Sequence, residues 1–87
     1  MNINDQKIVT LVSDIKFTLT KLDPAKHQKL IDLLIECSNK LENTNGKLDS
    51  LINNSITEIE KCVSENNLNV PDEVAELVKL FSAFLPH

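Results

Sequence analysis

The chain has 87 residues, 41% of them hydrophobic, and a formal net charge of −4 from 13 acidic residues and nine lysines. A chain of this size forms one domain, and its aliphatic content is enough for a core, which excludes a disordered tail. It has no arginine, the usual bidentate ligand of phosphate and guanine, and its scattered lysines form no basic stripe, so we expect no nucleic-acid binding.

The first predicted element is a helix over about residues 4–22, because its apolar residues recur at helical spacing on one narrow face. These residues are Ile8, Leu11, Val12, Ile15, Leu19 and Leu22. Phe17 lies on the opposite side of this helix, where its neighbours include Ser13 and Thr20. The helix should end at Asp23-Pro24, since proline disfavours the helical state of the residue before it and suits the first position of a new helix. Asp23 is a natural N-cap for that next helix.

The second predicted helix covers about residues 24–43. Its main apolar stripe consists of Leu30, Leu33, Leu34, Cys37 and Leu41. Ile31 and Ile35 lie on one flank and widen the apolar arc, so this helix should contact two neighbours.

The stretch "ENTNG", residues 42–46, admits two interpretations. Leu34, Leu41 and Leu48 are seven residues apart, as in one long coiled-coil helix that would run through Gly46. Against a continuous helix, poor helix formers and a glycine follow one another here, and the seven-residue spacing stops at Ser55. We therefore predict a turn over residues 43–46 that makes the second and third helices an antiparallel hairpin.

The third helix is predicted over about residues 46–66 and the fourth over 71–85, where Pro71 precedes two acidic residues that suit a first helical turn. The apolar face of the third helix contains Leu48, Leu51, Ile52, Ser55, Ile59 and Cys62. That of the fourth contains Val74, Leu77, Val78, Leu80, Phe81, Phe84 and Leu85. One glycine and three prolines are too few for the many tight turns of a β-fold. The fold class predicted for the single domain, residues 1–87, is all-α: an antiparallel four-helix bundle, up-down-up-down with short connections.

The possible metal ligands are His27, Cys37, Cys62 and His87, but no pair has the spacing of a metal site. Both cysteines lie on apolar stripes, where a buried free thiol is the ordinary interpretation, and the hairpin should keep them apart. No catalytic triad, phosphate-binding loop or inward-facing carboxylate pair is recognisable. We therefore expect a protein that is not an enzyme and that has no catalytic residues, metal or cofactor.

An alternative function comes from Leu48-Asp49-Ser50-Leu51, near the start of a helix, and "LNVPDE", residues 68–73. These segments resemble the corresponding motifs of acyl carrier proteins, which are small, acidic helical bundles. The resemblance implies that Ser50 would carry phosphopantetheine. The chain departs from that family in having a helix where carriers have a long loop, and two extra residues before the proline.

Two features favour binding to another protein. Phe17 stands among polar residues, and "LVKLFSAFL", residues 77–85, contains a single charge. Phe17 is either covered by a neighbouring helix or loop or free for a contact, and residues 77–85 form either the most buried helix of the bundle or a site of self-association. The predicted contact residues, toward a partner protein or a second copy, are Phe17, Leu80 and Phe84. No apolar run is long enough to span a membrane and no signal peptide is recognisable, so we expect a cytoplasmic protein. The predicted function is that of a small acidic binding module, such as an inhibitor, immunity protein or chaperone-like adaptor.

Overall fold

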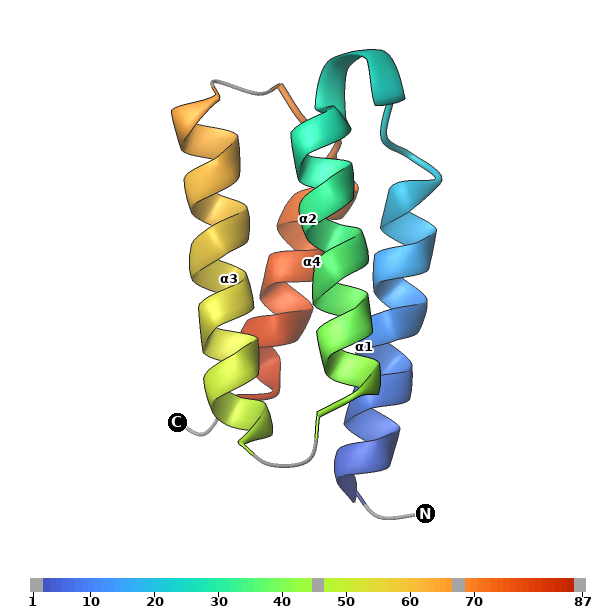
Figure 1. The fold of residues 1–87 in the computed structure, drawn as a ribbon, viewed down its shortest axis with the longest axis vertical. Coiled ribbons are helices and arrows are strands. Elements are labelled where there is room, and N and C mark those ends of the chain that lie inside the picture. The colour runs from blue at the N-terminus through green and yellow to red at the C-terminus, as the bar shows by residue number, and fades with distance from the viewer. Residues whose placement is uncertain (1–2, 45–46, 67–68, 86–87) are drawn as a thin grey trace.

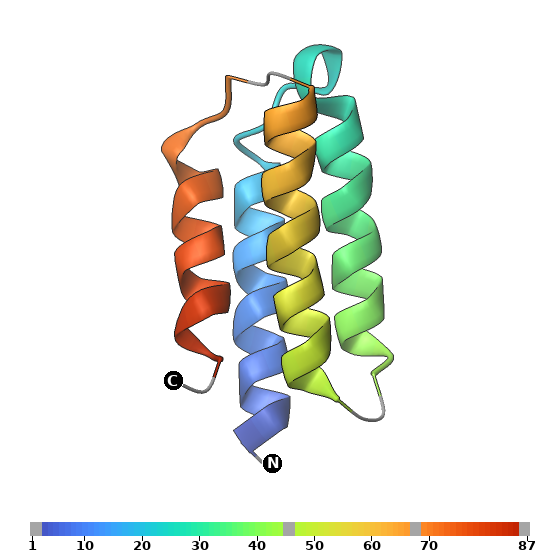
Figure 2. The same ribbon diagram turned by 90° about the vertical axis from the view of Figure 1, so that its left-hand side faces the viewer.

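The computed structural model describes residues 3–44, 47–66 and 69–85. These residues form four helices: α1 (Ile3–Leu19), α2 (Pro24–Glu42), α3 (Leu48–Glu65) and α4 (Asp72–Ala83). The helices lie side by side and alternate in direction, so that the ends of α1 and α4 nearest the two termini are at the same end of the molecule (Figures 1 and 2). Each helix packs against two neighbours, α1 and α3 both contacting α2 and α4. The predicted antiparallel four-helix bundle is confirmed.

The α2–α3 hairpin decides between the two interpretations of the "ENTNG" stretch in favour of the turn. α2 ends at Glu42, α3 begins at Leu48, and the two helices pack against each other. Glu36 and Asn54 line the same small cavity between the two helices. In one continuous helix these two residues would be about 27 Å apart. Gly46, the predicted start of the third helix, lies outside the described residues.

The first helix ends at Leu19, three residues before the predicted boundary. The backbone N–H groups of Thr20, Lys21 and Leu22 each donate to the carbonyl three residues earlier, at 2.9–3.3 Å. This tighter hydrogen bonding is typical of the last turn of a helix and satisfies its terminal carbonyls. The fourth helix closes in the same way, with Phe84 and Leu85 donating to carbonyls three residues back, and therefore ends at Ala83 rather than at residue 85.

The second helix begins as predicted. The Asp23 carboxylate accepts a hydrogen bond of 2.9 Å from the N–H of Ala25, and Pro24 occupies the first helical position. Such a cap satisfies a backbone donor that has no partner within the helix. The direction of the chain from α1 into α2 is therefore fixed by local chemistry at Asp23.

Among the described residues, the hydrophobic core contains 14 buried side chains, and every one lies on a predicted apolar stripe. They are Leu11, Val12, Ile15, Leu22, Leu30, Leu34, Cys37, Leu41, Leu48, Ile52, Ile59, Val74, Leu77 and Phe81. The expectation that α2 contacts two neighbours is confirmed. Ile35 on its flank is nevertheless 46% exposed, because the flank extends beyond the area that α1 and α3 cover.

Candidate functional site

Two of the three large exposed hydrophobic side chains in the described part of the chain belong to α1. Val9 is 55% exposed and Phe17 is 52% exposed. They lie on the same side of α1, because residues eight apart are separated by little more than two helical turns. Ile15, two residues before Phe17, is fully buried, so one face of α1 packs into the bundle and the opposite face offers apolar surface to a binder.

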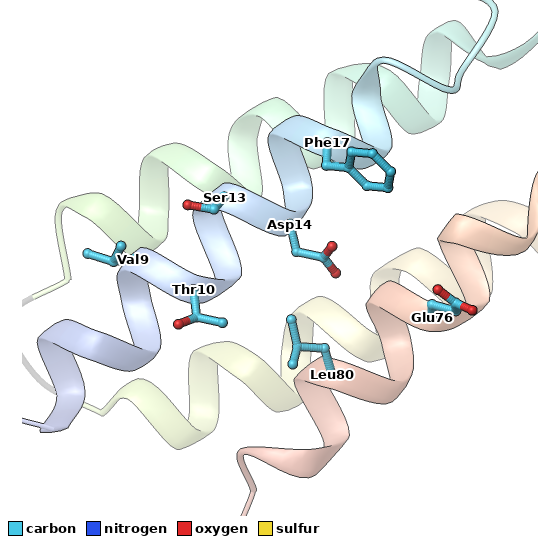
Figure 3. A pocket seen from close by; sticks show the side chains of 7 residues that line it. All are labelled: Val9, Thr10, Ser13, Asp14, Phe17, Glu76 and Leu80. Atoms are coloured by element: carbon cyan, nitrogen blue, oxygen red, sulfur yellow. The ribbon is translucent and has the colours of Figure 1, made fainter.

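A groove of about 590 Å³ runs between α1 and α4 beside these side chains. Its lining consists of Val9, Thr10, Ser13, Asp14 and Phe17 from α1, and Glu76 and Leu80 from α4. Figure 3 shows the side chains of Asp14 and Leu80 directed toward the space between the two helices. The groove thus combines apolar surface with two carboxylates.

The electrostatics of the groove are unfavourable to the charged form of Asp14. The pKa of Asp14 is raised above its usual value. Partial burial is the larger cause, and the negative charge of Glu76 is the smaller one. Within the described ranges, no salt bridge is formed by either carboxylate. Beside Phe17, the Nζ of Lys21 lies 5.3 Å from the centroid of the ring, a distance at which an ammonium group is attracted to an aromatic ring.

The structure brings together two of the three predicted contact residues. Phe17 and Leu80 both line the α1–α4 groove, with Leu80 half-buried. Phe84 instead packs against the hydrophobic core at the end of α4 and is not part of the lining. Its predicted role in a contact has no support from the groove.

Sequence reasoning missed three lining residues, Val9, Asp14 and Glu76. Val9 had a detectable signal, since it is an aliphatic residue outside the apolar stripe of its helix and eight residues before Phe17. Asp14 and Glu76 looked like ordinary solvated charges. Only the packing of α1 against α4 places them on one groove.

A second groove, of about 460 Å³, lies between α3 and α4. Its lining is largely aliphatic and includes Ile59, Val63, Val70, Val74 and Val78, with Glu60 and Lys79 also present. The connection between these helices passes through residues 67–68, which lie outside the described ranges. None of the three large exposed hydrophobic side chains of the described residues lines this second groove.

Ser50, the serine of the alternative carrier function, is exposed in the first turn of α3. Its exposure leaves the hydroxyl accessible to a modifying enzyme. The connection from α3 to α4 has no helix among its described residues 66 and 69–71. The resemblance to carriers therefore rests on the two quoted motifs.

Cys37 and Cys62 are both free thiols, and Cys37 is buried while Cys62 is half-buried. The thiol of Cys37 donates to the hydroxyl of Ser55 at 3.0 Å, and that hydroxyl donates to the carbonyl of Leu51 at 2.8 Å. Burial raises the pKa of the Cys37 thiol, which makes the thiolate scarce and the group unreactive. Its position is that of a core side chain.

His27 is buried and its ring bonds to backbone groups at both nitrogens. In the described part of the chain, no group of three or more histidine, cysteine or acidic side chains is arranged to hold a metal ion. His87, the remaining candidate ligand from the sequence, lies outside that part. Likewise, none of the described helices has the length and apolar character required to cross a membrane.

Comparison with protein-family models, curated proteins and solved structures found no match for this chain. A four-helix bundle serves many unrelated functions, so the fold alone identifies none of them. The α1–α4 groove, which combines two large exposed hydrophobic side chains with two carboxylates, is the candidate site.

Proposed function

We propose that this protein acts by binding another protein through the α1–α4 groove, without catalysing a reaction, and that it does so in the cytoplasm. The observation that carries the proposal is the half-exposed ring of Phe17 at the edge of a groove that also contains Val9 and Leu80. Complete burial of a phenylalanine side chain contributes about 1.5–3 kcal/mol. A partner that covers the exposed half of the Phe17 ring therefore gains binding free energy from the burial of this apolar surface.

The geometry favours a protein partner over a small molecule. Enclosed pockets bury most of a small ligand, whereas this groove is bounded by two helices and leaves Val9 and Phe17 about half exposed. Aromatic side chains, phenylalanine included, are enriched at protein–protein interfaces relative to the rest of the surface. Inhibitors, immunity proteins and adaptor chaperones all work in this way, by surface contact alone.

The test compares Phe17→Ala with Ile35→Ala in affinity purification from cells that naturally produce the protein. Ile35 is the matched control, because it is similarly exposed but lies on α2, away from the groove. The wild type and Ile35→Ala should recover the same partner, and Phe17→Ala should lose it. Equal recovery by both variants would place the contact elsewhere on the surface.

The alternative function is that of an acyl carrier modified on Ser50, and the observation in its favour is the exposure of Ser50 near the start of α3. It requires that a broad-specificity phosphopantetheinyl transferase adds one group to the chain. Ser50→Ala should then abolish the addition. An unchanged intact mass of the wild type after this reaction would remove the carrier function.

A further inference from the structure

The two carboxylates of the groove restrict what can bind in it, if binding through the groove is the function. Asp14 and Glu76 come from different helices, face one groove, and have no ion-pair partner among the described residues. Partial burial of Asp14 makes its negative charge costly. A positive charge placed between the two carboxylates would relieve this cost and would gain charge-assisted hydrogen bonds.

The distance between Val9 and Phe17 sets the spacing that the apolar residues of a binder must match. Val9 and Phe17 are separated by eight residues of α1, which is about 12 Å along the helix axis. Asp14 lies between them, three residues from Phe17. Two apolar side chains at positions i and i+7 of a helix span about 10.5 Å, so one helix can reach both ends of the groove and present a residue to its middle.

A helical segment fits this site better than an extended one. An extended peptide obtains much of its binding energy from main-chain hydrogen bonds to an exposed strand edge. The walls of this groove are two helices, whose backbone groups are bonded internally. A helix, in contrast, satisfies its own backbone and offers only side chains to the groove.

A second copy of this chain is a poor occupant. In a two-fold symmetric contact through this groove, the patch that carries Asp14 and Glu76 would face the same patch of the other copy. Like charges brought together in an interface are unfavourable, and the chain has a net charge of −4. Charge complementarity therefore points to a different, basic partner.

We propose that the partner segment is an amphipathic helix that carries a lysine or arginine between two apolar anchors at i and i+7. The anchors contact Val9 at one end of the groove and Phe17 at the other, with Leu80 between these two ends (Figure 3). The cation, at i+3 or i+4, lies between Asp14 and Glu76. Lys21 stands over the Phe17 ring and disfavours a second cation beyond that end.

The test selects 18-residue helical peptides from a randomised display library against the full chain, with no bias in charge. The selected peptides are then synthesised, and their Kd values are measured by fluorescence anisotropy. They should be enriched in lysine or arginine between apolar residues at i and i+7. Binding should be at least about tenfold weaker to Asp14→Asn/Glu76→Gln than to the wild type, and weaker at about 0.5 M salt than at about 0.05 M. Thermal melts establish that the variants are folded.

The possible failures are distinguishable. Peptides that require Phe17 but have no excess of basic residues, or that bind the double variant as tightly as the wild type, overturn this inference and leave the proposed function intact. Peptides that bind Phe17→Ala as well as wild type overturn both, whereas a selection that recovers no helical binder overturns this inference alone. A dimer in sedimentation that is lost in Phe17→Ala would make a second copy the occupant and would also overturn the inference.

Discussion

Nε2 of His27 lies 3.0 Å from the carbonyl oxygen of Asn69. His27 belongs to the first turns of α2 and Asn69 to the connection between α3 and α4, so this bond joins two corners of the bundle that are far apart in sequence. The other ring nitrogen, Nδ1, accepts a 3.0 Å hydrogen bond from the N–H of Asp23. Because Nδ1 accepts a hydrogen bond, Nε2 is the nitrogen that donates to Asn69. The His27 side chain thus accepts from the backbone N–H of the N-cap residue, as the glutamate of a capping box does.

We predict that His27→Ala lowers the free energy of unfolding by about 1–3 kcal/mol, because it removes both hydrogen bonds of a buried ring, each worth about 0.5–1.5 kcal/mol. Urea denaturation monitored by circular dichroism measures this. Gln28→Ala is the control, since Gln28 is exposed and bonds only to the neighbouring Asp32. If both variants unfold at the same urea concentration as the wild type, the His27–Asn69 bond contributes nothing to stability.

Ile15 and Phe17 are close in sequence and opposite in environment, being 0% and 52% exposed. Ile15→Ala should lower stability by about 2–5 kcal/mol, because it leaves a cavity in the core. Phe17→Ala removes a half-exposed ring that contacts the ammonium group of Lys21, and should lower the free energy of unfolding by less than about 1 kcal/mol. Thermal melting of the two variants compares the costs directly. A melting temperature for Phe17→Ala as low as that of Ile15→Ala would mean that Phe17 supports the fold and is not free for a partner.

Most of the fold could be predicted from the sequence because hydrophobic periodicity and local signals agree. Among the described residues, the buried hydrophobic side chains all lie on predicted stripes, and Asp23 caps α2. The burial of Thr18 and His27 was not predictable from hydrophobic periodicity, because that pattern identifies buried positions by apolar side chains and these two are polar. Each is accommodated by a hydrogen bond that only the folded chain reveals, that of Thr18 being a 2.8 Å bond to the carbonyl of Asp14.

The candidate site was only partly predictable. Phe17 was recognisable because an aromatic residue stands on a polar helix face, and Leu80 because it belongs to a segment with few charges. That Asp14 and Glu76 share a groove depends on which helices are neighbours and on how each is rotated. Helical periodicity gives the face of each helix but not the pairing of residues across two helices.

The two cysteines should differ in reactivity. Cys37 is buried and the pKa of its thiol is raised by burial, whereas Cys62 is half-buried. Only the thiolate reacts with N-ethylmaleimide, so Cys62 should be alkylated first in the native protein, and Cys37 should react only through local opening of α2 against α3. Peptide mapping by mass spectrometry follows both sites, and unfolding in urea is the control that should abolish the difference. Comparable native rates would contradict the burial of Cys37.

Asp14→Asn should stabilise the protein at neutral pH. Because its pKa is raised in the folded state, the fold binds a proton at Asp14 more readily than the unfolded chain does. The associated stability is present at low pH and is lost as the pH rises through the raised pKa. At pH 7 the charged side chain is thus unfavourable, and removing the charge should raise the free energy of unfolding by about 0.2–1 kcal/mol, the range for exposed charge pairs. Urea denaturation of both proteins at pH 7 and pH 3 measures the difference, which should vanish at pH 3.

Glu76→Gln separates the two causes of the raised pKa. Burial is the larger cause and the charge of Glu76 the smaller, so Glu76→Gln should stabilise less than Asp14→Asn at pH 7. The double variant should gain less than the sum of the single variants, because either substitution removes the repulsion between the two carboxylates. Strict additivity would mean that Asp14 and Glu76 do not interact across the groove. A gain for Asp14→Asn that persists at pH 3 would show instead that the asparagine stabilises through its packing, and that the carboxylate charge does not oppose the fold.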